Sequence, residues 1–533
     1  MLVAQAIERY DEGVINDTSG GNTMNRKAKF ATLSLATVML TGVIAGCSSS
    51  KNEGSSAANA TPAASTSSSS APKESYEIAI AIPVFGAVSK DMQAVQDEIS
   101  KIAKAKINAT VKIMPISIGA WEQQMNLMTS GREKLDLYFT FGAGYSTGVA
   151  AGKMVPVDNL LDKYGEGIKK QIDSAYLSSA KIDGKTYGIP VYKDYTTGVP
   201  GVLMKKDLVE KYKIDVSSIK NIDDLDRIYK TIKDNEPNVV PLGAGLSLPS
   251  QTYVWYDKLG DRLGVLPGYD NGLKIVNLFE TKEYEDYLNK MHSWNKAGYF
   301  NKDAATTQAS GADLLKAGKA FSYFIGLKPG NLEREIRTYG TDLVFAPVMS
   351  NIYATTTDTQ AGLWTISTNS TNPERVMMLL NLMYTDKDLA NLFVYGIEGK
   401  HYVKVSDNTI DYPTGIDKKT VGYSWDSWLY ANPSIAYLMK SDLQDMWKLT
   451  SEANQKAIKS KALGFTFNAE PVKNEVTALK NVTDQYVKGL ESGTLDPADK
   501  LPEFRAKLKA AGIDKVIAEK QKQLDAWAAA NKK

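Results

Sequence analysis

Residue types that commonly catalyse reactions or bind metals are scarce in this chain. Its 533 residues include one cysteine, Cys47, and two histidines, His292 and His401, which lie far apart in the sequence. A zinc site or an activated thiol needs several such side chains together. The sequence therefore predicts no metal site, no cofactor and no cysteine-dependent catalysis.

Cys47 stands where a lipid could be attached. A basic segment, 24–29, precedes an apolar stretch, 30–45, and small residues lead directly into the cysteine. This order describes a secretory signal peptide, and Ile44-Ala45-Gly46-Cys47 resembles a bacterial lipobox, in which the cysteine is acylated and becomes the N-terminus. Several acyl chains are used because one chain binds a membrane only marginally. We predict an extracytoplasmic protein anchored to the outer face of the cell membrane through Cys47; the alternative is an ordinary signal peptide that contains a cysteine.

The segments around Cys47 fit this interpretation. Residues 1–46 form a leader with the signal peptide, and we take Met24 as the true start because 1–23 is polar and carries both charge signs. Residues 47–75 are rich in serine and alanine and have few large apolar side chains. Such a tract cannot bury enough surface to fold, so we expect a flexible tether.

Carboxylates offer the other possible chemistry. A glycoside hydrolase needs two of them on opposite sides of a cleft. Individually possible residues are Asp136, Asp194, Asp257 and Glu398. The sequence brings no two of them together, so a secreted lipoprotein hydrolase remains an alternative, as does a surface sensory or structural lipoprotein.

The composition narrows the class of partner. The chain has 63 Lys plus Arg against 61 Asp plus Glu, so there is no basic excess that would indicate nucleic-acid binding. Its 28 Tyr and 8 Trp combine apolar rings with polar tips. Such side chains suit the recognition of amphipathic ligands.

Strand and helix patterns alternate from Tyr76 onward. Strand patterns cover 76–82, 109–116 and 135–141, and helical patterns cover 89–106 and 120–130. This alternation predicts a parallel α/β sheet. Since ligands of such sheets bind at the carboxyl ends of strands, we expect loops 117–121 and 142–148 to lie near a ligand. Residues 181–190 have the pattern of a hairpin with an Asp-Gly turn.

Several segments carry a family resemblance. They are, in order, SGREKLDLYF, GKMVPVDNLLDKYG, IDGKTYGIPVYKD, LMKKDLVEKYKID, AGKAFSYFIG and NSTNPERVMMLLNLMYTD. Together they resemble the extracellular solute-binding lipoproteins of ABC importers, the family that includes the maltose-type sugar binders. YGIEGKHY, ALGFTFNAEPVKNE and KLKAAGIDKVIAEKQKQLDAW further resemble a subgroup with a C-terminal domain of unknown function. The resemblance covers nearly everything from Tyr76 to the end.

The resemblance implies a fold and a function. The fold is α/β and periplasmic-binding-protein-like, with two lobes, a hinge and a central cleft that closes on ligand, followed by a C-terminal helical segment. The function is capture of an oligosaccharide in the cleft and its delivery to the transmembrane subunits of an ABC permease, by a monomer that is not an enzyme. The residues leave open which sugar is bound, and whether the ligand is instead a peptide-like solute.

Candidate binding residues follow from positions within that fold. The N-lobe, hinge and second-lobe candidates are Trp121, Tyr145, Tyr192, Lys193, Asp194, Trp255, Tyr256, Lys328, Trp364 and Trp425. Lys328 stands near a position where the family often stacks an aromatic ring. Trp428 lies with Trp425 where the C-terminal segment should recross the cleft. For each aromatic side chain the alternative is packing in a core.

The resemblance also divides the folded chain. The expected parts are 76–195 for the first part of the N-lobe, 196–345 for the C-lobe, 346–450 for the return to the N-lobe and 451–533 for the C-terminal helices. In the last part, Ile517, Leu524 and Trp527 form an apolar stripe. Because a helix of this kind gains its stability by packing such a stripe, we expect the segment to dock on the two-lobe body.

Overall fold

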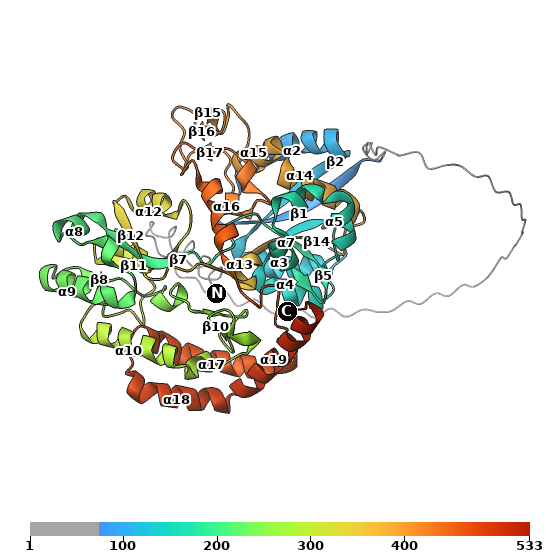
Figure 1. Cartoon of the computed structure of the whole chain (residues 1–533). Helices are drawn as coiled ribbons and strands as arrows, with labels where there is room; N and C mark the ends of the chain where they lie inside the picture. Colours follow the sequence, from blue (N-terminus) through green and yellow to red (C-terminus); the bar gives the residue numbers. More distant parts are fainter. Residues whose placement is uncertain (1–73, 533) are drawn as a thin grey trace, which may run out of the picture.

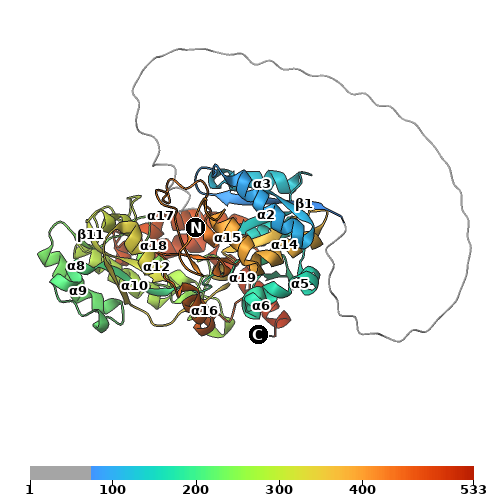
Figure 2. The same ribbon diagram turned by 90° about the horizontal axis from the view of Figure 1, so that it is seen from above.

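Residues 74–532 are described by a computed structural model, and they form two lobes that lie side by side (Figures 1 and 2). Each lobe is built on its own β-sheet, and a set of C-terminal helices lies against one of them. Cys47 and the rest of the leader and tether lie outside the described residues. None of the helices within 74–532 is long and apolar enough to cross a membrane.

The N-lobe sheet has five strands. In spatial order they are β2 (Ala109–Ser117), β1 (Tyr76–Val84), β3 (Leu137–Phe141), β14 (Gly362–Ile366) and β6 (Gly188–Pro190). β1 is parallel to β2 and β3, whereas β14 is antiparallel to β3 and β6. The last seven residues of β1 are all buried, as expected for a central strand with both faces covered.

Helices cover this sheet because their apolar residues recur on one face. In α2 (Met92–Ile107) the buried residues include Met92, Val95, Ile99 and Ala103, at helical spacing. The other N-lobe helices are α3 (Trp121–Ser130), α4 (Gly142–Ala150), α5 (Asp158–Tyr164), α6 (Glu166–Gln171), α7 (Ser174–Ser178), α14 (Pro373–Thr385) and α15 (Lys387–Tyr395). Asn372 caps α14 by accepting a hydrogen bond from the backbone of Arg375.

The C-lobe sheet has four strands. In spatial order they are β12 (Leu343–Pro347), β7 (Val199–Lys205), β11 (Ala320–Leu327) and β8 (Val240–Leu242). β8 and β11 are parallel, and β7 is antiparallel to β11 and β12. The helices of this lobe are α8 (Lys206–Lys211), α9 (Leu225–Asn235), α10 (Lys282–Lys296), α11 (Gly311–Lys316) and α12 (Asn331–Tyr339).

In both sheets, strands that include β3 and β11 have their carboxyl ends near the segments that join the lobes. In the N-lobe, Phe141 at the end of β3 pairs with Gly362 at the start of β14, and β6 ends as the chain leaves for the C-lobe. In the C-lobe, Leu327 at the end of β11 pairs with Val199, the first residue of β7. The edges at which open α/β sheets commonly bind ligands therefore lie near the hinge in both lobes.

Three passages of the chain form this hinge. The first runs from β6 to β7, the second contains β13 (Tyr353–Ala354), and the third contains α16 (Met446–Lys456) and β18 (Ile458–Lys459). Thr196 of the first passage bridges to Ala354 of the second, and β13 pairs in parallel with β18. The passages are thus joined by backbone hydrogen bonds.

The C-terminal helices are α17 (Lys473–Glu491), α18 (Pro497–Ala510) and α19 (Ile513–Ala530). α17 and α18 pack on α10 in the C-lobe, and α19 extends from there toward the N-lobe (Figure 1). Leu524 and Trp527 join a cluster with Phe465. The predicted docking of this segment on the two-lobe body is confirmed.

The strands and helices predicted between 76 and 141 are also confirmed, with small shifts at their ends. The hairpin forms between β4 (Lys181–Ile182) and β5 (Lys185–Thr186), where Asp183 and Gly184 both have positive φ, as a two-residue turn of this type requires. The expected loop at 142–148 is wrong, because α4 begins directly at the end of β3.

Candidate binding site at the strand ends

An exposed aromatic surface lies at the carboxyl edge of the N-lobe sheet. Phe85 follows β1, and Phe141 ends β3. The ring of Trp428 lies over both, with centroids 5.5 Å from Phe85 and 6.5 Å from Phe141. The chain places β2 on one side of β1 and then β3 on the other side, so the strand order reverses between β1 and β3. Open α/β sheets bind ligands at such a point of reversal. Trp428 is 45% exposed, so its ring is available there.

Trp428 reaches this edge because its segment is tied to the loop after β1. The hydroxyl of Ser89 donates to the carbonyl of Ser424 (3.1 Å) and accepts from the Ser424 amide (3.2 Å). The Asp91 amide donates to the carbonyl of Gly422 (3.1 Å). Two chain segments more than 300 residues apart (Ser89 and Ser424 are separated by 335) thus make one surface.

A buried histidine strengthens this attachment. The His401 Nδ1 accepts a hydrogen bond from the Ile397 amide (2.8 Å), so the proton is on Nε2, which donates to the Asp91 carboxylate (3.1 Å). Lys400 also pairs with Asp91 at 2.9 Å. Hydrogen bonds from Lys400 and His401 lower the pKa of Asp91. His401 therefore acts as a structural clamp, and its two ring nitrogens are both engaged.

A second aromatic group lies at the carboxyl end of β8 in the C-lobe. Tyr253 and Trp255 are partly exposed, with ring centroids 5.7 Å apart. Trp255 rests on the buried Tyr287 at 5.8 Å, and Tyr253 lies 6.5 Å from Phe324 of β11. Both rings are therefore supported from beneath and leave part of their surface free.

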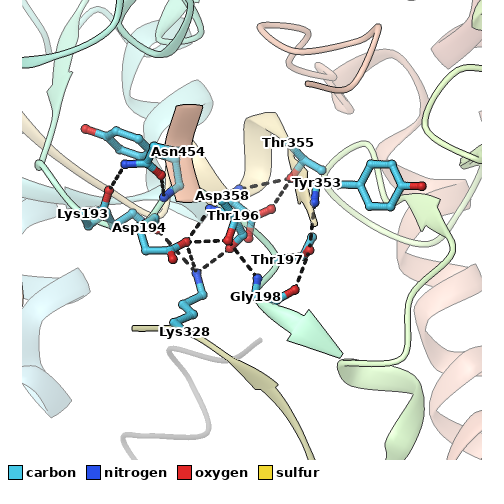
Figure 3. A network of polar contacts seen from close by, with 11 residues as sticks. Lys193, Asp194, Thr196, Thr197, Gly198, Lys328, Tyr353, Thr355, Asp358 and Asn454 are labelled. Carbon is cyan, nitrogen blue, oxygen red and sulfur yellow. Dashed lines mark hydrogen bonds and ion pairs between the residues drawn. The ribbon is translucent and has the colours of Figure 1, made fainter. Parts of the chain in front are cut away.

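The hinge between these groups is a polar network (Figure 3). One Asp194 carboxylate oxygen accepts hydrogen bonds from the amide (2.7 Å) and hydroxyl (2.6 Å) of Thr196. Lys328, which follows β11 in the C-lobe, pairs with the same oxygen at 3.4 Å and donates to the Thr196 carbonyl. The other carboxylate oxygen of Asp194 is buried and has no hydrogen-bond partner among the described residues.

The third hinge passage joins the network through Asn454. Its side-chain amide donates to the carbonyl of Lys193 (2.8 Å) and accepts from the amide of Tyr195 (2.8 Å). Trp447 of the same helix lies 6.1 Å from Tyr192, which is partly buried. Burial and the like charge of Lys328 lower the pKa of Lys193 to about 8. The hinge thus supplies two more aromatic rings and a cluster of charges.

The structure places the sequence-predicted residues in two kinds of surroundings. Tyr192, Lys193, Asp194 and Lys328 come together at the hinge, and Trp255 lies at the C-lobe strand end. These five remain predictions for ligand binding. Trp121 and Trp425 are almost completely buried against the N-lobe core.

Three predicted ligand-facing rings lie in cores instead. Tyr145 donates to the Ala180 carbonyl and accepts from the Tyr187 amide. Trp364 lies in the interior strand β14 and donates to the Leu429 carbonyl (3.1 Å). Tyr256 is buried in the C-lobe core. The prediction for these three is corrected to core packing, because neighbouring elements cover them completely.

Four further aromatic residues near these surfaces were not predicted from the sequence: Phe85, Phe141, Tyr253 and Trp447. Phe85 and Phe141 stand at the ends of two correctly predicted strands, so the strand-end rule applied to both would have identified them. Tyr253 and Trp447 carry no comparable local signal, because neither follows directly on a strand.

The carboxylates considered for hydrolysis have other partners. Asp136 accepts hydrogen bonds from Tyr76, Ser370 and the Ala79 amide. Glu398 pairs with Lys404 at 2.9 Å. The buried Asp257 accepts from the Leu259 amide, and Asp194 belongs to the hinge. No two of these four are joined by a hydrogen bond among the described residues.

Comparison with known proteins identifies the type of molecule. Residues 86–390 match the model for bacterial extracellular solute-binding proteins, and 461–529 match a domain of unknown function, DUF3502. The chain is 29% identical over 435 residues to a carbohydrate ABC transporter substrate-binding protein of Streptococcus pneumoniae serotype 4, covering 80% of this chain and 86% of that protein.

A solved structure covers the same span. The N-glycan transport solute-binding protein from Streptococcus pneumoniae matches with a TM-score of 0.76 at 28% identity, covering 86% of this chain and 100% of that one. Its complex with Man5GlcNAc matches with a TM-score of 0.64, covering 86% and 99%. These similarities confirm the family resemblance, the two-lobed α/β fold and the C-terminal domain predicted from the sequence.

Proposed function

Because the chain belongs to the family of bacterial extracellular solute-binding proteins, we propose that it captures an oligosaccharide between its lobes and delivers it to the permease of an ABC importer. The observation that carries this proposal is the pair of aromatic groups at the strand ends of the two lobes. One consists of Phe85, Phe141 and Trp428, and the other of Tyr253 and Trp255.

These groups have the chemistry that sugars require. The flat apolar face of a pyranose packs on an aromatic ring, while hydroxyls bond to polar groups at its edge. Two separated groups suit a ligand of several sugar units, since one ring on each lobe can hold a different unit. The relatives named for carbohydrate and N-glycan transport support the same ligand class.

Capture works through closure of the lobes. A ligand that touches Trp428 and Trp255 together gains both contacts only in the closed state, so its binding shifts the equilibrium toward closure. The hinge passages are hydrogen-bonded to each other, so each lobe can move as a unit about them. The chain superposes less well on its relative's complex with Man5GlcNAc (TM-score 0.64) than on the structure of that relative for which no complex is named (0.76), which supports an open arrangement here.

The proposed anchor is the lipid on Cys47, which the lipobox-like Ile44–Cys47 motivates. The tether 47–75 would then hold the binding lobes near the permease at the outer face of the membrane. We expect Cys47→Ser to release the protein from the membrane fraction and to leave the unfolding transition of the lobes unchanged. A variant that stays in the membrane fraction would contradict the anchor.

The central test is binding of defined oligosaccharides. Titration calorimetry with Man5GlcNAc and with unrelated oligosaccharides and peptides should yield saturable binding for a sugar and none for peptides. A bound sugar should also raise the melting temperature, because it binds only the folded state. Binding of a peptide alone contradicts the ligand class. Chromatography of the same mixtures distinguishes the hydrolase alternative, since cleaved sugar in the wild-type sample contradicts a pure binding role.

A further inference from the structure

We propose that the C-terminal helices, whose family has no assigned function, position the C-lobe half of the binding site. The inference rests on the proposed function, because it concerns the loop that carries Tyr253 and Trp255. Two buried charged residues, Glu491 of α17 and Lys520 of α19, hold that loop. Both therefore act as positioning residues that need not touch the ligand.

The loop needs support from outside itself. Between β8 and α10 the chain forms only one-turn helices at Pro249–Gln251, Asn271–Leu273 and Leu278–Glu280 and the two-residue strands β9 (Tyr256–Asp257) and β10 (Leu266–Pro267). A segment with so little regular secondary structure opens more easily than a sheet or a long helix unless other elements hold it.

Glu491 provides the first support. It is the last residue of α17 and only 1% exposed. One oxygen of its carboxylate accepts from the Ser250 hydroxyl, and the other accepts from the Arg262 guanidinium and the Tyr284 hydroxyl (2.9 Å). Ser250 precedes the two aromatic rings and Arg262 follows them, so one carboxylate fixes both sides of the ligand-facing stretch.

The chemistry of burial explains why this contact is specific. A buried carboxylate is tolerated only when cations and hydrogen-bond donors satisfy both of its oxygens. Ser250 and Arg262 supply such partners only in the observed loop conformation, so moving the loop leaves the charge without them. Tyr287, on which Trp255 rests, also packs in the same core as Leu490.

Lys520 provides an independent second support. It is 0% exposed, pairs with Asp261 and donates to the Gly264 carbonyl (3.2 Å). The neighbouring Gln521 accepts from the Ile275 amide (2.8 Å) and donates to the Leu273 carbonyl (3.0 Å). The second half of the loop is therefore held by α19 as the first half is held by α17.

The matched control is Glu503 of α18. Like Glu491 it accepts from a tyrosine hydroxyl, here Tyr486, and pairs with a cation, Lys500 at 3.0 Å. Its partners all belong to the C-terminal helices, so it does not contact the loop. If the C-terminal helices only added general stability, Glu491→Gln and Glu503→Gln would change hydrogen exchange in the loop to the same extent for the same loss of stability.

The experiment compares Glu491→Gln, Ser250→Ala and the control Glu503→Gln in the full chain. Ser250→Ala removes one hydroxyl and keeps the buried ion pair, so it remains informative if Glu491→Gln does not fold. Hydrogen exchange of residues 249–262 is measured without ligand, and Man5GlcNAc affinity is measured by calorimetry. We expect faster loop exchange in the first two variants, with an affinity loss of about tenfold for Glu491→Gln and about threefold for Ser250→Ala, the range for one buried hydrogen bond.

The two readouts separate this inference from the proposed function. Faster exchange in the loop, with exchange in α8 and α9 unchanged, supports positioning. Unchanged loop exchange in both Glu491→Gln and Ser250→Ala overturns it, and so does equally faster exchange in Glu503→Gln. If the wild type binds no oligosaccharide, the proposed function is wrong, and so is the part of the inference that concerns ligand affinity. Hydrogen exchange of the loop still decides whether the C-terminal helices hold it.

Discussion

In the N-lobe two of the rings proposed to bind the ligand stand at the ends of regular strands, whereas in the C-lobe Tyr253 and Trp255 lie in a long loop. The backbone of β1 and β3 places Phe85 and Phe141, and only Trp428 is brought from a distant segment. The C-lobe rings depend on Glu491 and Lys520, which the C-terminal helices supply. A sheet positions side chains by many small backbone contacts, while the loop depends on a few strong buried ones.

The first prediction, a large effect on stability, concerns the buried contact in the C-lobe. Glu491→Ala should reduce the free energy of unfolding by about 3 kcal/mol, because it leaves Arg262 without its partner in a largely buried place. The N-lobe counterpart, Asp91→Ala, should have a smaller effect because Asp91 faces solvent more. Urea unfolding monitored by circular dichroism measures both. Equal losses in the two variants would show that the lobes do not differ in this respect.

The next effect concerns ligand affinity. Trp428→Ala should weaken oligosaccharide binding by about 2 kcal/mol, roughly 30-fold, as truncation of a central aromatic contact does. Because the Trp428 side chain is 45% exposed, the melting temperature of the Trp428→Ala variant should differ little from that of the wild type. Calorimetry and thermal unfolding of the same sample separate the two quantities.

Trp364→Ala is the matched control for that substitution. This ring is fully buried in β14, so its loss should destabilise the N-lobe by about 3–5 kcal/mol. The folded fraction should retain its affinity. If instead Trp428→Ala unfolds the protein and Trp364→Ala abolishes binding without unfolding, the assignment of surface and core is reversed.

A smaller effect is expected when His401, which helps to hold the segment that carries Trp428, is replaced. His401→Ala removes two hydrogen bonds, to Asp91 and Ile397, and should reduce stability by about 1–2 kcal/mol and weaken binding severalfold. His401→Gln can both accept from the Ile397 amide and donate to Asp91, so it should restore much of the affinity. Titration calorimetry of the two variants tests this. Equal losses in both would indicate that the ring shape matters more than its hydrogen bonds.

The smallest effect is a dependence on pH. The pKa of Asp91 is lowered from 3.8 by hydrogen bonds from Lys400 and His401. A carboxyl group with a lowered pKa in the folded state adds stability above its unfolded pKa and loses it as the pH falls through the folded value. The difference in melting temperature between wild type and Asp91→Asn should therefore be constant near pH 6 and shrink below about pH 4. A difference that does not change between pH 6 and pH 3 contradicts this.

Much of the fold follows from the sequence because the signals are local. Alternating and helical patterns between 76 and 141 predict the first strands and helices, and the Asp-Gly pair predicts the hairpin turn. The apolar stripe with Leu524 and Trp527 predicts that the last helix must pack on another element. In each case neighbouring residues determine the backbone conformation.

Which aromatic rings are exposed, and so are proposed to bind the ligand, was decided only by the tertiary structure. Trp364 and Trp428 are the same residue type, but Trp364 lies within β14, in a sheet covered on both faces, whereas Trp428 lies over the open edge of that sheet. Likewise, no local pattern pairs Glu491 with Ser250, since 241 residues separate them. Exposure and buried ion pairs depend on distant elements that pack together, so they become definite only when the whole chain has folded.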